Sequence, residues 1–204
     1  GLPEARWKDM ATRSPAGELV DAWGTPGVRH GTLSNPAYLR YLMTWCRQQI
    51  DAGVDYLFMD EIDAAHAPRE GYDDYALDDF REYLLKKYCG EQGWTRDDPR
   101  WRKRFGIDPA DGKVCPGGTM ANFDYRAYLR RGGHIERPGS PKNPLAGEWH
   151  IFTRVRDERA WKWLVDRIRA YARSKGRRVL ISANGLAPHV DLQGRRVLDI
   201  GCGN

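Results

Sequence analysis

Two short apolar segments of the sequence each end in side chains that could do chemistry. The first, Val54–Met59, is followed directly by Asp60 and Glu61, with Asp63 close behind. Two neighbouring carboxyl groups can divide acid and base work, because burial and mutual repulsion push their pKa values apart. Since side chains alternate along a strand, we expect Asp60 to point into a site and Glu61 to support it. The competing interpretation is that these acids only cap the next loop or pair with an arginine.

The second apolar segment, Arg178–Ala183, leads to Asn184 and then, in the following loop, to His189. An asparagine at the end of a strand can hold a hydroxyl group of a ligand or orient a carboxylate. It can equally well form a local turn in which its side chain bonds to the backbone. We therefore treat Asn184 and His189 as candidate ligand contacts and keep the turn as the alternative.

Histidines and tryptophans supply the remaining candidates. His30 precedes the first long helical segment, and His66 follows the acidic segment. No H-x-H or H-x-x-x-H spacing joins the histidines, so we expect neither a metal nor another cofactor. Trp23, Trp94 and Trp101 are predicted in loops or short segments, where an indole face could stack on a ligand ring or simply pack the fold.

Helices and strands are expected to alternate. Helical spacing of apolar residues, caps and breakers predict helices over about 36–52, 72–88, 97–105, 122–131 and 143–174, with strands over 54–59, 178–184 and 197–200. The long helix is expected to be interrupted near Arg154–Arg159. Such alternation favours an α/β fold with a parallel sheet. In such sheets chemistry lies beyond the carboxyl ends of the strands, where Asp60 and Asn184 are placed.

Composition excludes several classes of protein. With 204 residues, 41% of them hydrophobic, the chain suits one domain, with a helical and loop insert at about 90–143. No apolar run approaches the roughly 20 residues of a membrane helix, so no membrane partner is expected. The net charge is +5, but 28 acidic residues are interleaved with 33 basic ones, which argues against a nucleic-acid partner. None of the four cysteines forms a C-x-x-C pair.

Several of these segments resemble a known family. The stretches Ser34–Tyr38 and Ile50–Glu61 resemble the segments of glycoside hydrolase-like TIM barrels related to α-amylase and to family 42 β-galactosidase. Tyr75–Tyr88 and Val179–Asn184 are similar to the following helix and to a later strand of those barrels. One departure is Tyr56, where the family usually has glycine. The resemblance implies a TIM-barrel-like (β/α) fold, and the two or three strands predicted here imply an incomplete barrel, since eight are needed.

The resemblance also implies a function. It predicts a glycosidase that hydrolyses a poly- or oligosaccharide with two carboxyl groups, Asp60 as nucleophile or base and Glu61 beside it. Trp23, His30, Asp63, His66, Asn184 and His189 are the expected carbohydrate contacts. A secreted or periplasmic location is favoured by the resemblance, and the oligomeric state is left open. The main alternative is a barrel-derived module that binds carbohydrate, or serves a structural role, without catalysis.

A further alternative comes from the last eight residues. Val197–Asn204, VLDIGCGN, looks like the strand and glycine-rich turn with which Rossmann methyltransferases bind S-adenosylmethionine. That motif requires a following helix and further strands to complete the cofactor site. We retain the start of a methyltransferase as the third hypothesis.

Overall fold

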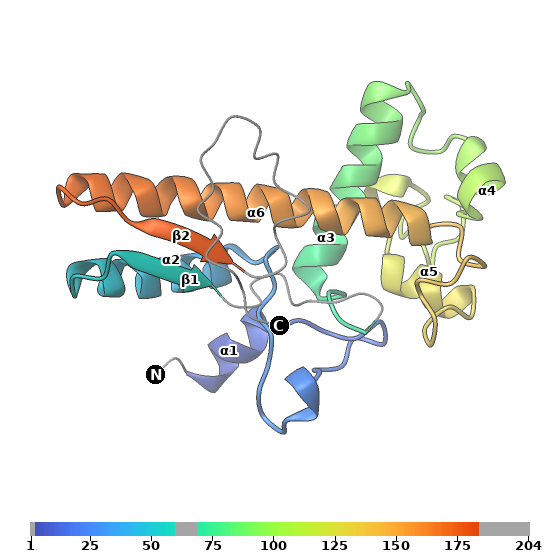
Figure 1. Cartoon of the computed structure of the whole chain (residues 1–204). Coiled ribbons are helices and arrows are strands. Elements are labelled where there is room, and N and C mark those ends of the chain that lie inside the picture. The colour runs from blue at the N-terminus through green and yellow to red at the C-terminus, as the bar shows by residue number, and fades with distance from the viewer. Residues whose placement is uncertain (1–2, 60–68, 184–204) are drawn as a thin grey trace.

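The protein combines helices with one small parallel sheet. The computed structural model describes residues 3–59 and 69–183 (Figure 1). Its elements in chain order are α1 Glu4–Met10, the 3₁₀ turn η1 Ala22–Gly24, α2 Pro36–Asp51, β1 Tyr56–Met59, α3 Asp74–Leu84, the π-helical η2 Leu85–Glu91, α4 Arg100–Phe105, η3 Met120–Asn122, α5 Tyr125–Arg131, α6 Ala146–Ser174 and β2 Leu180–Ala183. This confirms the α/β prediction at the level of mixed helix and parallel strand. The TIM-barrel arrangement stays a prediction.

The two strands lie side by side and run in the same direction. Tyr56 pairs with Leu180 and Met59 with Ala183, so the carboxyl ends of β1 and β2 meet at one edge. Arg177 positions this register, because its guanidinium donates to the carbonyl oxygen of Ile50 at 2.6 Å and pairs with Asp55 at 2.8 Å. Arg177, three residues before β2, is thereby tied to the end of α2 and to the segment before β1.

Helix α2 begins and ends where the sequence signals predict. Asn35 caps it, with its side-chain oxygen accepting from the backbone N–H of Ala37 at 2.8 Å, and Pro36 fills the first turn. After the last turn Gly53 takes a positive φ of 98°, a conformation that glycine adopts without steric cost. Cys46 lies on the buried face of α2, as its position in the apolar stripe predicts.

One face of the sheet packs on helices and the other is open. A sheet core forms around Cys46 and Ile50 of α2, Leu57 of β1, and Leu164 and Ile168 of α6. The side chains that point the opposite way are exposed: 43% for Tyr56, 47% for Phe58 and 58% for Leu180. Strand β1 is therefore buried on one face only. The side chain of Leu57 packs against the helices, and the apolar side chains on the other face of the strand stay exposed.

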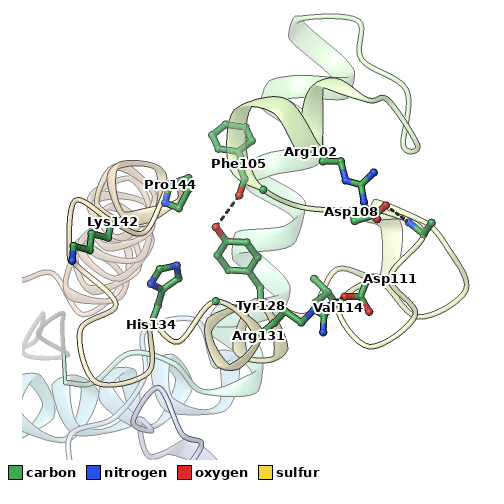
Figure 2. Close-up of a pocket in the computed structure, with 13 residues that line it drawn as sticks. Arg102, Phe105, Asp108, Asp111, Val114, Tyr128, Arg131, His134, Lys142 and Pro144 are labelled. Carbon is green, nitrogen blue, oxygen red and sulfur yellow. Dashed lines mark hydrogen bonds and ion pairs between the residues drawn. The ribbon is translucent and has the colours of Figure 1, made fainter.

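The helices from α3 to α5 gather around the first half of α6 (Figure 1). They enclose a helical core that includes Tyr72, Phe80, Trp101, Tyr125 and Trp149. Helix α6 continues past this core and reaches the sheet core, so one helix runs through both halves of the molecule (Figure 1). A cavity opens between α4, α5 and the loop before α6 (Figure 2).

Several local expectations need correction. Helix α6 is unbroken near Arg154–Arg159, because Arg156 is buried on the same stripe as the apolar residues before and after it. Trp94 and Trp101 are packed into the helical core, so of the three candidate tryptophans only Trp23 is exposed. The sequence signals also missed α1, a helix of only two turns with no side-chain cap.

Candidate functional site

The structure brings two of the predicted site residues into contact. Trp23 and His30 lie edge to face, with ring centroids 4.6 Å apart and ring planes at 86°. The other predicted site residues lie outside the described parts of the chain: Asp60, Glu61, Asp63, His66, Asn184 and His189. The site described below is therefore built from Trp23, His30 and the residues that hold them.

His30 forms a close pair with Glu70. Its Nδ1 lies 2.9 Å from Oε2 of Glu70, and both side chains are about one-tenth exposed. Because a carboxylate can only accept, Nδ1–H is the donor, and this fixes the tautomer of a neutral imidazole. Nε2 then carries the free lone pair, and it is buried without a hydrogen-bond partner among the described residues.

Three extended segments hold this pair in place. The backbone N–H of Thr12 donates to the carbonyl oxygen of His30 at 2.9 Å, and that of Gly71 donates to Oγ1 of Thr12 at 2.6 Å. The backbone N–H of Tyr72 donates to the carbonyl oxygen of Arg13 at 3.0 Å. The segment around Thr12 thus lies between those that carry His30 and Glu70, and the pair is held in place by backbone groups and by the buried Thr12 hydroxyl.

The segments that carry the pair adjoin the sheet in sequence. Leu33, three residues after His30, packs in the sheet core beside Leu57 and Met59 of β1. Glu70 comes at the end of the segment that follows β1 in the chain. The arrowheads of β1 and β2 point toward the N-terminal segment, which is blue in Figure 1. In parallel sheets this is the edge at which ligands bind.

Trp23 is held in a strained backbone conformation and faces solvent. Its φ is +53°, a left-handed value that is uncommon outside glycine, and its side chain is 67% exposed. The turn around it is closed by Asp21, whose Oδ1 accepts from the backbone N–H of Gly27 at 3.0 Å and which pairs with Arg29. An exposed indole in a strained, well-supported turn is a signature of functional sites.

A second titratable group is buried two residues from Gly71. Asp73 caps α3 through Oδ1, which accepts from the backbone N–H of Ala76 at 3.0 Å. Burial raises the pKa of Asp73 above its usual value, against the opposing effects of the Thr32 hydroxyl, of that backbone bond and of the charge on Arg156. Arg156 is itself 1% exposed, and its Nη1 has no hydrogen-bond partner among the described residues.

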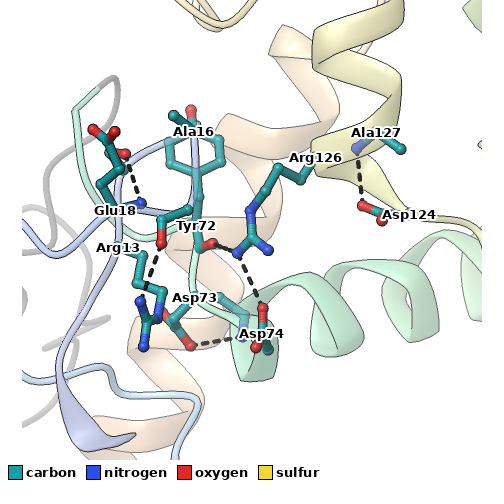
Figure 3. Close-up of polar contacts among 12 residues, drawn as sticks. Arg13, Ala16, Glu18, Tyr72, Asp73, Asp74, Asp124, Arg126 and Ala127 are labelled. Atoms are coloured by element: carbon teal, nitrogen blue, oxygen red, sulfur yellow. Dashed lines mark hydrogen bonds and ion pairs between the residues drawn. The ribbon is translucent and has the colours of Figure 1, made fainter. Parts of the chain in front are cut away.

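Arg126 fixes the position of the segment that carries Glu70 and Asp73. From α5 its Nη2 donates to the carbonyl oxygen of Tyr72 at 2.6 Å and to Oδ1 of Asp74 at 3.0 Å (Figure 3). The start of α3 is therefore tied to the helical core on one side and to the N-terminal segment on the other. Such support from both sides is what a preorganised site requires.

The comparisons with known proteins do not identify this site. No family model, curated protein or solved structure matches the chain. Within residues 3–59 and 69–183, no cluster of histidine, cysteine and carboxylate side chains is arranged to hold a metal. None of the helices in that part of the chain combines the length and apolar character needed to cross a membrane. The chemistry must therefore be argued from the side chains themselves.

The arrangement is that of a base oriented by a carboxylate. Glu70 holds the imidazole of His30 with Nδ1 as the donor, and the buried Nε2 is left as a free acceptor. Trp23 contributes a flat apolar face directly beside the imidazole. This combination suits a ligand that carries both hydroxyl groups and an apolar face.

Sequence reasoning singled out His30 and Trp23 but missed Glu70, Asp73 and Arg156. For Arg156 the signal was present, since a charged residue occupied a position of the apolar stripe between Phe152 and Ala160. Asp73 could have been found as the cap of the predicted helix over 72–88. Nothing in the sequence marks Glu70, because its pairing with His30 joins segments 40 residues apart.

Proposed function

We propose that the chain belongs to a carbohydrate-active hydrolase that cleaves poly- or oligosaccharides at the carboxyl edge of its parallel sheet. The observation that carries this proposal is the exposed Trp23 beside the His30–Glu70 pair. Sugar rings present C–H faces to aromatic rings and hydroxyl groups to polar side chains. The pair and the indole offer both kinds of contact at once.

The fold adds support by analogy. Two adjacent parallel strands with helices on one face are what neighbouring (β/α) units of a TIM barrel look like, and the open face with Tyr56 and Phe58 would then line the barrel interior. A fold of this kind hosts many activities, so the function is argued from the site.

Two carboxyl groups are needed for glycoside hydrolysis. In this proposal Asp60, which directly follows β1 in the sequence, acts as nucleophile or base, and Glu61 or Asp63 acts as the acid. Glu70 orients His30, and the His30 imidazole supports the Trp23 indole at the site. Trp23 stacks on a sugar ring.

The remaining predicted residues complete the subsites of the proposed enzyme. His66, Asn184 and His189 contact further sugar hydroxyl groups. No nucleic acid takes part, and no cofactor is required.

Binding without hydrolysis is the second candidate. It is favoured because the carboxylates described at the site are already engaged: Glu70 accepts from His30, Asp73 from the backbone of Ala76, and Asp21 from the backbone of Gly27. A protein of this kind would retain Trp23 as its sugar platform and would make no use of Asp60.

The test compares binding with turnover on a panel of α- and β-linked polysaccharides. We expect reducing-sugar release by the wild type, a loss of about a hundredfold or more in Asp60→Asn, and weakened binding in Trp23→Ala. The matched control is Trp45→Ala, because Trp45 is also exposed but lies on α2. Binding without release, unchanged in Asp60→Asn, would establish the second candidate. Neither binding nor release on the whole panel would overturn both.

A further inference from the structure

A cavity in the helical half of the molecule has the features of a separate ligand site. It measures about 590 Å³ and is lined from α4, from the turn after it, from α5 and from the loop before α6 (Figure 2). Its volume falls in the range of small-molecule sites. The cavity plays no part in the function proposed above, and the inference drawn from it does not depend on that function.

An aromatic wall with fixed geometry forms the middle of the cavity. Tyr128 and Phe105 are both buried, and the Tyr128 hydroxyl donates to the carbonyl oxygen of Phe105 at 2.8 Å. Burial raises the pKa of Tyr128 to about 12, so the phenol stays neutral and keeps this bond at ordinary pH. The wall therefore presents a rigid, uncharged surface to whatever enters.

On one side of this wall the charges are balanced. Arg102 pairs with Asp108 at 2.6 Å, and Arg131 pairs with Asp111 at 2.9 Å. Each carboxylate also accepts from a backbone N–H two residues further on, at 3.1 Å and 3.0 Å. These acids are engaged within their own turns and are not positioned to neutralise cations across the cavity.

The other side carries two basic side chains without a matching acid. His134 and Lys142 line it, and Figure 2 shows them across Tyr128 from Asp108 and Asp111. Neither forms an ion pair with a carboxylate among residues 3–59 and 69–183. The ammonium group of Lys142 and the imidazole of His134, both in the lining at this end, favour an oxyanion there.

Local contacts hold the loop that carries His134 and Lys142 in a defined conformation. A Cβ on Gly132 would lie 2.6 Å from Cδ2 of His134, so a larger residue there would displace the imidazole from its position. The backbone N–H of His134 donates to the carbonyl oxygen of Leu129 at 2.8 Å. The loop is closed by buried Asn143, whose Nδ2 donates to the carbonyl oxygen of Pro138 at 2.6 Å.

We propose that this cavity binds a small organic anion, with its oxyanion group between Lys142 and His134 and its remaining body against Tyr128 and Phe105. The oxyanion is a carboxylate or a phosphate ester, and both present the same chemistry to the two basic side chains. The 590 Å³ accommodate a body of about the size of one sugar ring.

The test measures ligand affinity with the full chain by isothermal titration and by amide chemical shifts. The probes are inorganic phosphate, glucuronate as the carboxylate, and glucose as the neutral analogue of the latter. We expect one or both anions to bind, glucose to bind at least tenfold more weakly than glucuronate, and Lys142→Ala and His134→Ala each to weaken the anion about tenfold. Whichever anion binds more tightly identifies the source of the oxyanion.

The matched control is Lys86→Ala, which removes an exposed lysine that does not line the cavity. It should leave the affinity within twofold. Equal losses in all three variants would mean that net charge, not this cavity, attracts the anion, and would overturn the proposal. Failure of both anions to bind at millimolar concentration, or binding unchanged in Lys142→Ala and His134→Ala, would also overturn it. These outcomes do not depend on whether the chain hydrolyses polysaccharides, so the two proposals can fail separately.

Discussion

The carboxylate of Glu148 joins three side chains of the helical core, and its removal should weaken the fold measurably. From α6 it accepts from Lys87 Nζ at 2.7 Å, from the Tyr88 hydroxyl at 2.6 Å and from the Tyr83 hydroxyl at 3.0 Å. All three donors come from α3 and η2. The substitution Glu148→Gln keeps the size of the side chain but exchanges an acceptor-only carboxylate for an amide, so the ion pair is lost.

The size of the effect follows from these contacts. Hydrogen bonds to charged groups contribute about 1.5–3 kcal/mol each, and neutral ones about 1 kcal/mol. Because the Lys87 side chain remains about a quarter exposed, water recovers part of its loss. We expect Glu148→Gln to lower the free energy of unfolding by about 2 kcal/mol, and Glu148→Ala, which also leaves the Tyr88 hydroxyl unpaired, by about 4 kcal/mol.

The same contacts predict a dependence on pH. Burial acts to raise the pKa of Glu148, but the hydrogen bonds from Lys87, Tyr88 and Tyr83 and the charge of Lys87 outweigh it and hold the pKa below its usual 4.5. A carboxylate whose pKa is lowered on folding stabilises the protein above pH 4.5, and this contribution is lost as the pH falls through the folded value. The difference between wild type and Glu148→Gln should therefore be constant near pH 7 and shrink below pH 4.5.

Urea unfolding followed by tryptophan fluorescence measures this difference directly. The control is Glu158→Gln on the same helix, where the side chain is exposed and the change should stay within about 0.5 kcal/mol. A Glu148→Gln protein as stable as the wild type at pH 7, or a difference that grows on acidification, would refute the reasoning.

Three further predictions follow from local contacts. Gly31→Ala should destabilise the fold by about 2 kcal/mol in thermal or urea unfolding, because the new Cβ would lie 2.1 Å from Cε2 of Tyr38. The Arg100 guanidinium lowers the pKa of Asp98 to about 2, so its carboxyl carbon resonance should hold constant from pH 7 to pH 4, and its stabilising effect should disappear only as the pH falls toward 2. Burial raises the pKa of the Cys115 thiol to about 12, so a disulfide reagent at pH 8 should label it only after unfolding.

Each of these has an internal comparison. Gly147→Ala, in α6 with nothing within 4 Å of the new Cβ, should not destabilise, and equal losses in both glycine variants would contradict the contact argument. An Asp98 resonance that titrates near pH 4 would exclude the ion pair in solution. Cys89 is only partly buried and should react before Cys115, as peptide mapping by mass spectrometry can show.

The sequence was most informative where local chemistry decides the structure. Asn35 and Pro36 set the start of α2, and the two apolar runs place β1 and β2 within two residues of their observed bounds. Their parallel pairing also follows the predicted alternation. The exposure of Tyr56 and Phe58 could not be predicted, because an apolar run does not reveal how many layers cover it.

Only part of the candidate site could be predicted from the sequence, for a related reason. His30 and Trp23 could be named as residue types able to act, but the partner of His30 is decided by how three extended segments pack. Glu70 has no local pattern that distinguishes it from other surface acids. Conversely, Trp94 and Trp101 are of a residue type that is common in ligand clefts, but they pack in the helical core. An indole suits a cleft and a core equally well, so residue type alone cannot distinguish the two.

Helix α6 has a mechanical consequence for the whole molecule. Trp149 and Phe152 belong to the helical core, Leu164 and Ile168 belong to the sheet core, and Arg156 lies between the two sets on the same stripe. A single continuous helix therefore contributes side chains to both cores. Unfolding of α6 at either end removes contacts in one core and weakens the helix that packs in the other. The two halves are therefore expected to unfold as one cooperative unit rather than in succession.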